Sequence, residues 1–411
     1  MFRREERHEG KVASDSAGQP AGGCKGEGVP PCPRPFAASG QAPARIANFF
    51  WGAMKTYKHL FAQVCTFDNL WNAFHQARKG KRSKGSVAAF EYDLERNLFT
   101  LERELRAGSY RPGRYHHFYI FEPKRRKISA APFRDRVVHH ALCNVIEPIF
   151  ERRFSDASFA CRIGKGTHRA LDRAQHFARR YRYVLQGDVV QFFPSVDHAV
   201  LRGLLACRIA DPQVMALIDQ ILASGAGVLS SEYTPQWFPG DDLFTPFERP
   251  RGLPIGNLTS QFWGNVVLNE LDTCVAQELR TGAYVRYADD LLLFGNDKAQ
   301  LHVWREQLSA CLARLRLVLH DRKTQIYPVE TGIPFLGFRL FPLHRRLKRP
   351  NVIRFKRRMR VLLAGYADGE LPYDRVQASI NGWVAHAAHG STYRLRSQLL
   401  GGLVVPRRGA R

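Results

Sequence analysis

The stretch "VRYADDLLLFG", residues 285–295, places Asp289 and Asp290 side by side between runs of large apolar residues. These runs predict two buried strands joined by a short turn. One explanation is a hairpin with a solvated acidic tip, but the pairs typical of tight hairpin turns, Asn-Gly and Asp-Gly, are absent from the stretch. The other explanation is a divalent-metal site, because such ions prefer clustered oxygen ligands on a rigid support. A site for two metal ions would need at least one further carboxylate.

A third carboxylate is found in "YVLQGDVVQFFPSVDH", residues 183–198, where Asp188 ends an apolar strand. An aspartate in this place often caps the next helix, and for a lone aspartate that explanation is sufficient. If a helix and then a strand ending at Asp289 and Asp290 follow, however, three carboxylates come together. Two-metal phosphoryl-transfer sites require such an arrangement.

The composition points to a polyanionic partner. The 411 residues include 62 Lys and Arg against 37 Asp and Glu, which gives a net charge of +25, while 45% of the residues are hydrophobic. This excess favours nucleic acid or an anionic membrane surface. No apolar run approaches the ~20 residues of a membrane span, which disfavours the membrane. The eight cysteines are scattered without a C-x-x-C pair, which disfavours zinc and a disulfide framework and favours reduced thiols in a cytoplasmic protein.

The chain is long enough for two or three domains. Residues 1–45 are rich in Gly, Pro and charge and lack hydrophobic periodicity, which predicts disorder, and Met54 is an alternative start. Apolar residues at helical spacing predict helices over 86–108 and 136–154. From 181 to 340 strand-like and helix-like segments alternate, which predicts a mixed α+β domain, and the rest of the chain is expected to be helical and basic.

Several blocks of the sequence together resemble the bacterial, group II intron-like reverse transcriptases. The core blocks are "DVVQFFPSVD" (188–197), "GLPIGNLTSQFWGNVVLNELD" (252–272) and "YADD" (287–290), and the others, in family order, are "KISAAPFRDRVVHHAL" (127–142), "ASFACRIGKGTHRAL" (157–171), "LHDRKTQIY" (319–327) and "FLGF" (335–338). The resemblance covers about residues 54–395 and implies an α+β right-hand polymerase. Its expected parts are a disordered extension (1–53), an N-terminal region with fingers (54–180), a ferredoxin-like palm (181–343) and a helical thumb with a basic tail (344–411).

The resemblance also implies the catalytic residues of an RNA-directed DNA polymerase, which is a nucleotidyltransferase. Asp188, Asp289 and Asp290 would bind two Mg²⁺ ions with help from the main-chain carbonyl of Val189. Lys323 stands where the family has a lysine proposed to protonate departing pyrophosphate, although an ordinary surface lysine explains it nearly as well.

The same blocks imply the residues that would bind the incoming deoxynucleoside triphosphate. Lys127 and Arg136, with Arg126 and Arg134 close by, are expected to hold its phosphates. Phe193 would lie beneath the sugar and clash with a 2′-hydroxyl, while the preceding phenylalanine is expected in the core. An RNA-synthesising polymerase would instead need a small or polar residue there, so the sequence favours DNA as the product.

The basic end of the chain predicts a grip on nucleic acid. Between Asp321 and Arg360 there are twelve Lys and Arg against two acids, which would neutralise several phosphates without reading sequence. The residues expected to bind the template RNA and the primer–cDNA duplex are Arg345, Arg346, Lys348, Arg349, Lys356, Arg357 and Arg358.

Ile255 and Gln261, in "IGNLTSQ" (255–261), distinguish the subclass and are expected beside the nucleotide. Group II intron enzymes usually carry Gln and Pro at these two places. The pattern here resembles enzymes of diversity-generating retroelements, which copy a template RNA with errors at adenines and work with a small basic helical-bundle accessory protein. Two alternatives stay open: a reverse transcriptase of a retron, phage-defence, CRISPR-associated or group II intron system, and a non-catalytic RNA-binding protein, which the three aspartates disfavour.

Overall fold

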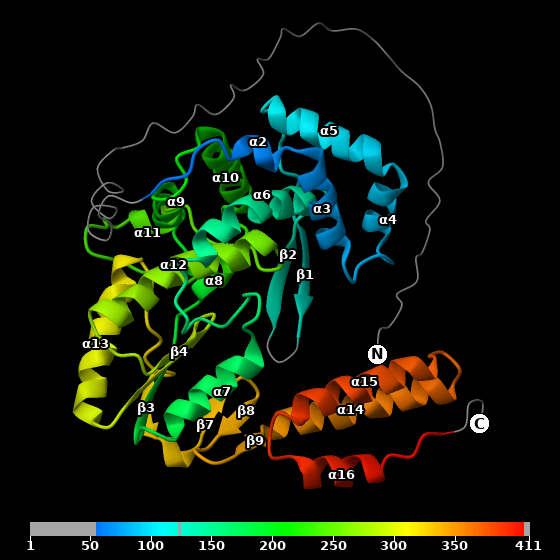
Figure 1. The fold of residues 1–411 in the computed structure, drawn as a ribbon, viewed down its shortest axis with the longest axis vertical. Helices are drawn as coiled ribbons and strands as arrows, with labels where there is room; N and C mark the ends of the chain where they lie inside the picture. The colour runs from blue at the N-terminus through cyan, green and yellow to red at the C-terminus, as the bar shows by residue number, and fades with distance from the viewer. Residues whose placement is uncertain (1–54, 122–124, 407–411) are drawn as a thin grey trace, which may run out of the picture. The chain divides into compact units, whose positions relative to one another are not determined.

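The computed structural model describes residues 55–121 and 125–406 (Figure 1). The extension predicted over 1–53 and the alternative start at Met54 lie outside the described residues. Helices alternate with antiparallel strands in the part that is described, so the mixed α+β character predicted from the sequence is confirmed.

The N-terminal helices pack on one another around an apolar core. They are α2 (Phe61–Val64), α3 (Phe67–Arg78), α4 (Gly85–Tyr92), α5 (Leu94–Arg106) and α6 (Phe133–Glu151). Leu70 and Phe74 of α3 and Leu142 of α6 are fully buried in this core. The single helix predicted over 86–108 is wrong, because the backbone breaks at Asp93 (φ −123°, ψ 53°) and leaves two helices. Aspartate is a poor helix-interior residue, since its side chain competes for nearby backbone groups.

Four antiparallel strands form the central sheet in the order β4–β5–β3–β6. Their bounds are β3 (Tyr183–Asp188), β4 (Tyr284–Tyr287), β5 (Asp290–Gly295) and β6 (Gln325–Pro328). The helices that pack on this sheet are α7 (Thr167–Ala178), α12 (Leu258–Gln277) and α13 (Lys298–Arg314).

Both faces of β5 are buried, which explains the apolar run after the aspartate pair. Successive side chains of a strand point to opposite faces of the sheet. Leu291 and Leu293 lie in the core that contains α12 and α13, whereas Leu292 and Phe294 lie in a second core with α7. A strand covered on both faces cannot alternate apolar with polar residues, so its sequence is apolar throughout.

The remaining elements flank this sheet along the chain. The hairpin is β1 (His116–Ile120) and β2 (Arg126–Ala130); the helices between β3 and α12 are α8 (Phe192–Ser195), α9 (His198–Ala206), α10 (Pro212–Gly225) and α11 (Thr245–Glu248), with a 3-10 turn at Ser230–Glu232. After a second 3-10 turn (Val329–Thr331), a small sheet follows, with β7 (Ile333–Phe335), β8 (Phe338–Leu340) and β9 (Arg345–Leu347), and then the C-terminal helices α14 (Arg349–Ala367), α15 (Tyr373–Ala387) and α16 (Tyr393–Gly401). The C-terminal helices have a small core of their own around Phe355, Met359 and Val376.

The cysteines differ from the expectation of reduced thiols. Cys274 of α12 and Cys311 of α13 form a disulfide with a Cα–Cα distance of 6.6 Å. The two residues are 37 positions apart, and their proximity depends on how the two helices pack, which no spacing rule in the sequence indicates. Separately, no helix in the described part of the chain is long and apolar enough to cross a membrane.

Candidate active site

The sheet brings the three predicted carboxylates together. β3 pairs with β5 in a register that sets Asp188 directly opposite Asp290, and Asp289 precedes Asp290 in the turn that joins β4 to β5. Neither residue of the pair is an exposed hairpin tip, since both are half-buried. The solvated-tip explanation of the "YADD" block therefore does not describe this turn.

A buried ion pair supports the turn that joins β4 to β5. Arg286 is 1% exposed and donates two hydrogen bonds to Asp272 of α12, each 2.7 Å long. Its Nη1 also donates to the carbonyl of Ala288 at 3.2 Å. Ala288 has a left-handed backbone (φ 54°), which a non-glycine residue rarely adopts. Arg286 thus links α12 to the residue immediately before Asp289.

Burial and mutual repulsion raise the pKa values of the aspartate pair. The pKa of Asp290 rises to about 6, first because the carboxyl is buried and then because Asp289 and Asp188 lie close by. The pKa of Asp289 is also raised, mainly by burial and further by Asp188, while Arg126 and Lys323 act in the opposite direction. Crowded carboxylates of this kind are stabilised by a cation with hard character.

Divalent magnesium fits this donor set, because Mg²⁺ binds through one or two carboxylates together with substrate phosphates. Val189, the predicted carbonyl ligand, is buried directly after Asp188 and bridges to Leu319. A tighter group of possible ligand atoms, Cys274, Glu278 and Cys311, occurs elsewhere in the described residues, but its two sulfurs are bonded to each other. The aspartates are therefore the better candidate metal centre.

Lys323 lies beside one of the three carboxylates. Its Nζ forms an ion pair with Asp188. The loop that carries it is held by the backbone, since the N–H of His320 donates to the carbonyl of Asp188 at 2.8 Å. A second lysine, Lys348, also faces the site, because it lowers the pKa of Asp290. The sequence alone predicts Lys348 only on the duplex-binding surface.

Two of the predicted phosphate-binding residues do not face the carboxylates. The Nζ of Lys127 donates to the carbonyl of Val228 at 2.9 Å, and the Nε of Arg136 donates to the carbonyl of Ala131 at 2.8 Å. Arg126, in contrast, lies close enough to Asp289 to act against the rise of its pKa. Arg126 and Lys127 are neighbours on β2, and neighbours on a strand point to opposite sides, so only the register could distinguish them.

Phe193, Ile255 and Gln261 are not fully enclosed in the core. Phe192 is buried, whereas Phe193 and Ile255 are half-buried and Gln261 is exposed. The N–H of Leu253 donates to the carbonyl of Phe193 at 2.8 Å, and the N–H of Ser129 on β2 donates to the carbonyl of Ile255 at 2.8 Å. These two bonds join the hairpin, the "GLPIGN" segment and the turn after Asp188.

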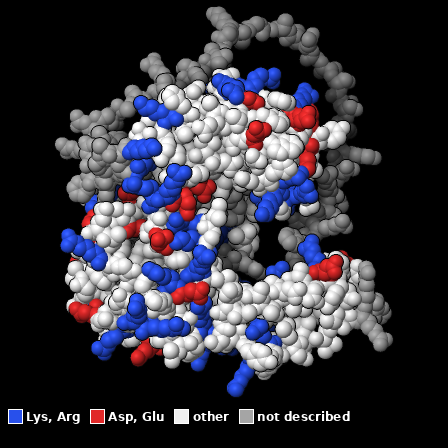
Figure 2. Space-filling view, in the orientation of Figure 1, with Lys and Arg blue, Asp and Glu red and all other residues white. Residues whose placement is uncertain are grey.

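The predicted duplex-binding residues divide into two groups. Arg345 forms an ion pair with Asp172 of α7 and is thereby engaged within the protein. The others, except half-buried Lys348, are exposed: Arg346, Arg349, Lys356, Arg357 and Arg358. On the face shown in Figure 2, Lys and Arg side chains are spread widely and are more prominent than acidic ones.

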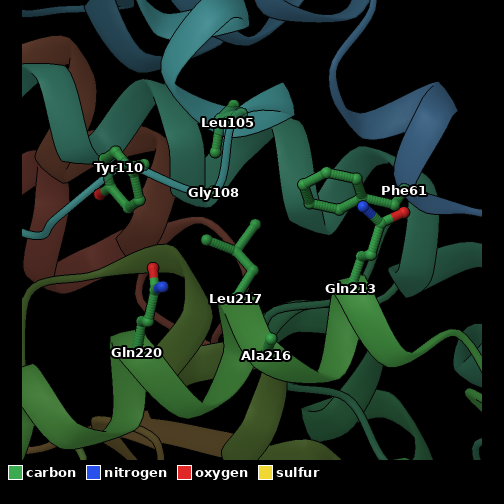
Figure 3. A pocket seen from close by; sticks show the side chains of 8 residues that line it. All are labelled: Phe61, Leu105, Gly108, Tyr110, Gln213, Ala216, Leu217 and Gln220. Carbon is green, nitrogen blue, oxygen red and sulfur yellow. The ribbon is translucent and has the colours of Figure 1, made fainter.

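The pocket drawn in Figure 3 lies away from the carboxylates. It has a volume of about 110 Å³ and is formed by the ends of α2 and α5 together with α10. Its lining residues are Phe61, Leu105, Gly108, Tyr110, Gln213, Ala216, Leu217 and Gln220. None of the predicted site residues is among them.

The chain is similar to several known proteins. Protein YkfC of Escherichia coli is 27% identical over 296 residues, which cover 62% of this chain and 74% of YkfC. The group II intron-encoded protein LtrA of Lactococcus lactis is 27% identical over 205 residues, which cover 49% of this chain but only 32% of LtrA. Nuclear intron maturase 1 of Arabidopsis thaliana is 34% identical over 90 residues, or 22% of this chain and 13% of the maturase.

A match to a whole family covers the part of the chain that carries the candidate site. The family described as reverse transcriptase (RNA-dependent DNA polymerase) matches residues 122–340, which is just over half of the sequence. This region contains the hairpin strand β2, the central sheet, Lys323 and all three aspartates. The chain belongs to the reverse transcriptase (RNA-dependent DNA polymerase) family.

Proposed function

We propose that the chain is an active RNA-directed DNA polymerase that makes cDNA from a template RNA in the cytoplasm. The observation that carries this proposal is the register that sets Asp188 opposite Asp290, next to Asp289, at one end of the central sheet. A protein that only bound RNA would have no need of three crowded carboxylates, two of them with raised pKa values.

Asp188, Asp289 and Asp290 would hold two Mg²⁺ ions, with the carbonyl of Val189 as a further ligand. When bound, Mg²⁺ lowers the pKa of an attacking hydroxyl and stabilises the charge of phosphoryl transfer. Arg126 would bind the triphosphate, because it is the cation of β2 that acts on Asp289. Lys127 and Arg136 would reach the nucleotide only if they leave the main-chain carbonyls that they contact.

Lys323 is suited to proton transfer during the release of pyrophosphate. It is paired with the carboxylate of Asp188, which would hold its amino group near the phosphates of a bound nucleotide. The half-buried Phe193 ring would restrict the sugar to deoxyribose, since a bulky ring leaves no room for a 2′-hydroxyl.

Within the family, the chain fits a diversity-generating retroelement, because Ile255 and Gln261 stand where intron enzymes usually carry Gln and Pro. Such an enzyme would make errors opposite template adenines, carry out mutagenic retrohoming and work with a small basic accessory protein. The similarity to LtrA favours a second candidate, an enzyme of a group II intron system.

Primer extension on an RNA template tests the activity. The parent should extend a DNA primer in the presence of Mg²⁺, and Asp289→Ala should lose at least about 10³-fold in rate, because removal of a metal ligand removes transition-state stabilisation. Asp321→Ala, a change at a largely exposed aspartate, is the matched control and should extend normally. Near-parental extension by folded Asp289→Ala would refute the catalytic assignment.

Sequencing of the same cDNA distinguishes the two candidates. Errors concentrated at template adenines support the retroelement, whereas a uniformly low error rate supports an intron-type or defence enzyme.

A further inference from the structure

The segment between α10 and the "GLPIGN" block exposes a group of large apolar side chains. We call residues 233–248 the aromatic loop. Trp237, Leu243, Phe244 and Phe247 in this loop are 53%, 69%, 64% and 60% exposed. Single exposed apolar residues are common, but several within one short segment indicate a binding surface.

Hydrogen bonds and ion pairs fix the backbone of the aromatic loop. The carboxylate of Asp242 accepts hydrogen bonds from the N–H groups of Phe244 and Thr245 at 2.9 and 2.7 Å. Asp241 forms a buried ion pair with Arg249, which also lies 3.3 Å from Asp197. These contacts fix the backbone of the loop, while the carboxylate of Asp242 and the large apolar side chains stay exposed.

The loop is also joined to the segment that follows the catalytic strand. The N–H of Thr234 donates to the side chain of Gln191 at 2.8 Å, three residues after Asp188. Trp237 and Phe247 contact each other edge to face, with ring centroids 6.0 Å apart. A preorganised group of rings loses little conformational entropy when a partner covers it.

The charge around the loop is opposite to that of the whole chain. No Lys or Arg occurs between Arg208 and Arg249, although the chain contains 62 of them. Asp242 and Glu248 are exposed beside the aromatic rings, and Glu232 is half-exposed. Acidic groups repel phosphates, so this surface disfavours RNA and DNA.

The β1–β2 hairpin shows the contrasting combination. Its exposed aromatic side chains, such as Phe118 and Tyr119, are accompanied by Arg125, Arg126 and Lys127. Aromatic rings among cations are typical of surfaces that stack nucleic-acid bases. In the aromatic loop the cations lie over the half-buried rings, Arg251 over Tyr233 and Arg249 over Phe238, and Arg249 is paired with Asp241. The exposed rings are accompanied by exposed Asp242 and Glu248 instead, so the partner is of another class.

We propose that the aromatic loop is the docking surface for a protein that presents apolar side chains surrounded by Lys and Arg. Trp237, Phe244 and Phe247 would fill apolar pockets of that partner, since aromatic residues dominate binding hot spots. Asp242 and Glu248 would form the charged rim, which selects a basic partner and speeds association. The inference rests on the proposed function, because a polymerase that works with an accessory protein needs a surface on which that protein docks.

Selection of displayed helical peptides of about 20 residues on the full-length protein tests the proposal without a known partner. The selected peptides are expected to combine apolar residues with Lys or Arg. Their affinity, measured by fluorescence anisotropy, should fall roughly tenfold or more for Phe244→Ser/Phe247→Ser and by several-fold for Glu248→Lys. Leu343→Ser, which alters another exposed apolar side chain, is the control and should leave affinity unchanged.

Four results would overturn the proposal. The selected peptides could lack an excess of Lys and Arg. They could also bind Phe244→Ser/Phe247→Ser with the same affinity as the parent. The double variant could lose affinity for a labelled RNA oligonucleotide, which would assign the loop to nucleic acid. Light scattering could show a parental dimer that the variant abolishes, which would make a second copy the occupant. Primer extension by the same variants is a separate readout, so a failure of the polymerase proposal would not be mistaken for a failure of this one.

Discussion

Asp290 is half-buried beside two other carboxylates, where its negative charge is unfavourable, and this predicts a pH-dependent stability. Its pKa is about 6 in the folded chain, above the ~3.9 of an unfolded aspartate. A raised carboxyl pKa stabilises the fold while the group is protonated, so this contribution is complete below pH ~4 and is lost as the pH rises through 6. Asp290→Asn stays neutral throughout. Its free energy of unfolding in a metal-free buffer should exceed that of the parent by about 1–3 kcal/mol near pH 8 and match it near pH 4.

Urea unfolding at several pH values with a chelator present measures this difference. Asp321→Asn provides the control, because that carboxylate is largely exposed. The Asp290→Asn variant should be inactive although it is more stable, as expected where a functional site holds unfavourable charges. Equal denaturant midpoints for parent and Asp290→Asn near pH 8 would contradict the prediction.

Phe193 gives a second prediction at a single residue. Phe193→Val should lower the preference for deoxynucleotides over ribonucleotides by roughly tenfold or more, because the smaller side chain leaves room for a 2′-hydroxyl. The measurement is the incorporation of dNTP and rNTP at one template position. Phe192→Leu is the matched control, since Phe192 is buried and should affect stability without changing sugar choice. A sugar preference that Phe193→Val leaves intact would place the gate at another residue.

At the scale of elements, the sequence predicted where strands and helices lie better than it predicted the side of a strand to which each residue points. Asp188 at the end of β3 and the helix 136–154 followed from local periodicity, and both are present. Arg126 and Lys127 could not be separated, because that choice depends on the register of β1 and β2. Arg286 was overlooked, although an arginine inside an apolar strand is a signal: burial of its charge requires a carboxylate partner, which is Asp272.

That ion pair yields a prediction about the β4–β5 turn. Arg286→Lys keeps the charge but loses the paired hydrogen bonds to Asp272 and the bond to Ala288, so the turn that carries Asp289 should be held less firmly. The Mg²⁺ concentration for half-maximal primer extension should rise several-fold, and the variant should be about 2–4 kcal/mol less stable. Titration of the extension rate with Mg²⁺, together with thermal melting, tests both effects.

Arg202→Lys is the control for this prediction, because Arg202 makes an equally paired contact with Asp219 at the surface. It should leave the Mg²⁺ dependence unchanged. If Arg286→Lys loses stability but keeps the parental Mg²⁺ requirement, the ion pair supports only the fold and not the position of the aspartates.

For the whole molecule, the distribution of charge matters more than its sum. The net charge of +25 by itself predicts only that the chain is attracted to polyanions. The structure adds which basic residues remain exposed: Arg357 and Arg358 on α14 are exposed, whereas Arg345 is engaged by Asp172 and Arg286 is buried. For Arg345, Arg357 and Arg358, sequence alone could not make this distinction, because each is an arginine in a basic context.

The exposed arginines of α14 lead to a prediction about nucleic-acid binding. Arg357→Glu/Arg358→Glu should weaken binding to a primer–template duplex and reduce the slope of log K against log salt by about one unit for each phosphate that the variant no longer neutralises. Arg152→Glu/Arg153→Glu changes the net charge by the same amount at two exposed arginines after α6 and is therefore the control. If charge acts only through the whole molecule, both double variants should weaken binding equally. If α14 contacts the duplex, only the first should change the salt slope, and an unchanged slope in that variant would assign these arginines to solvent or to a protein partner.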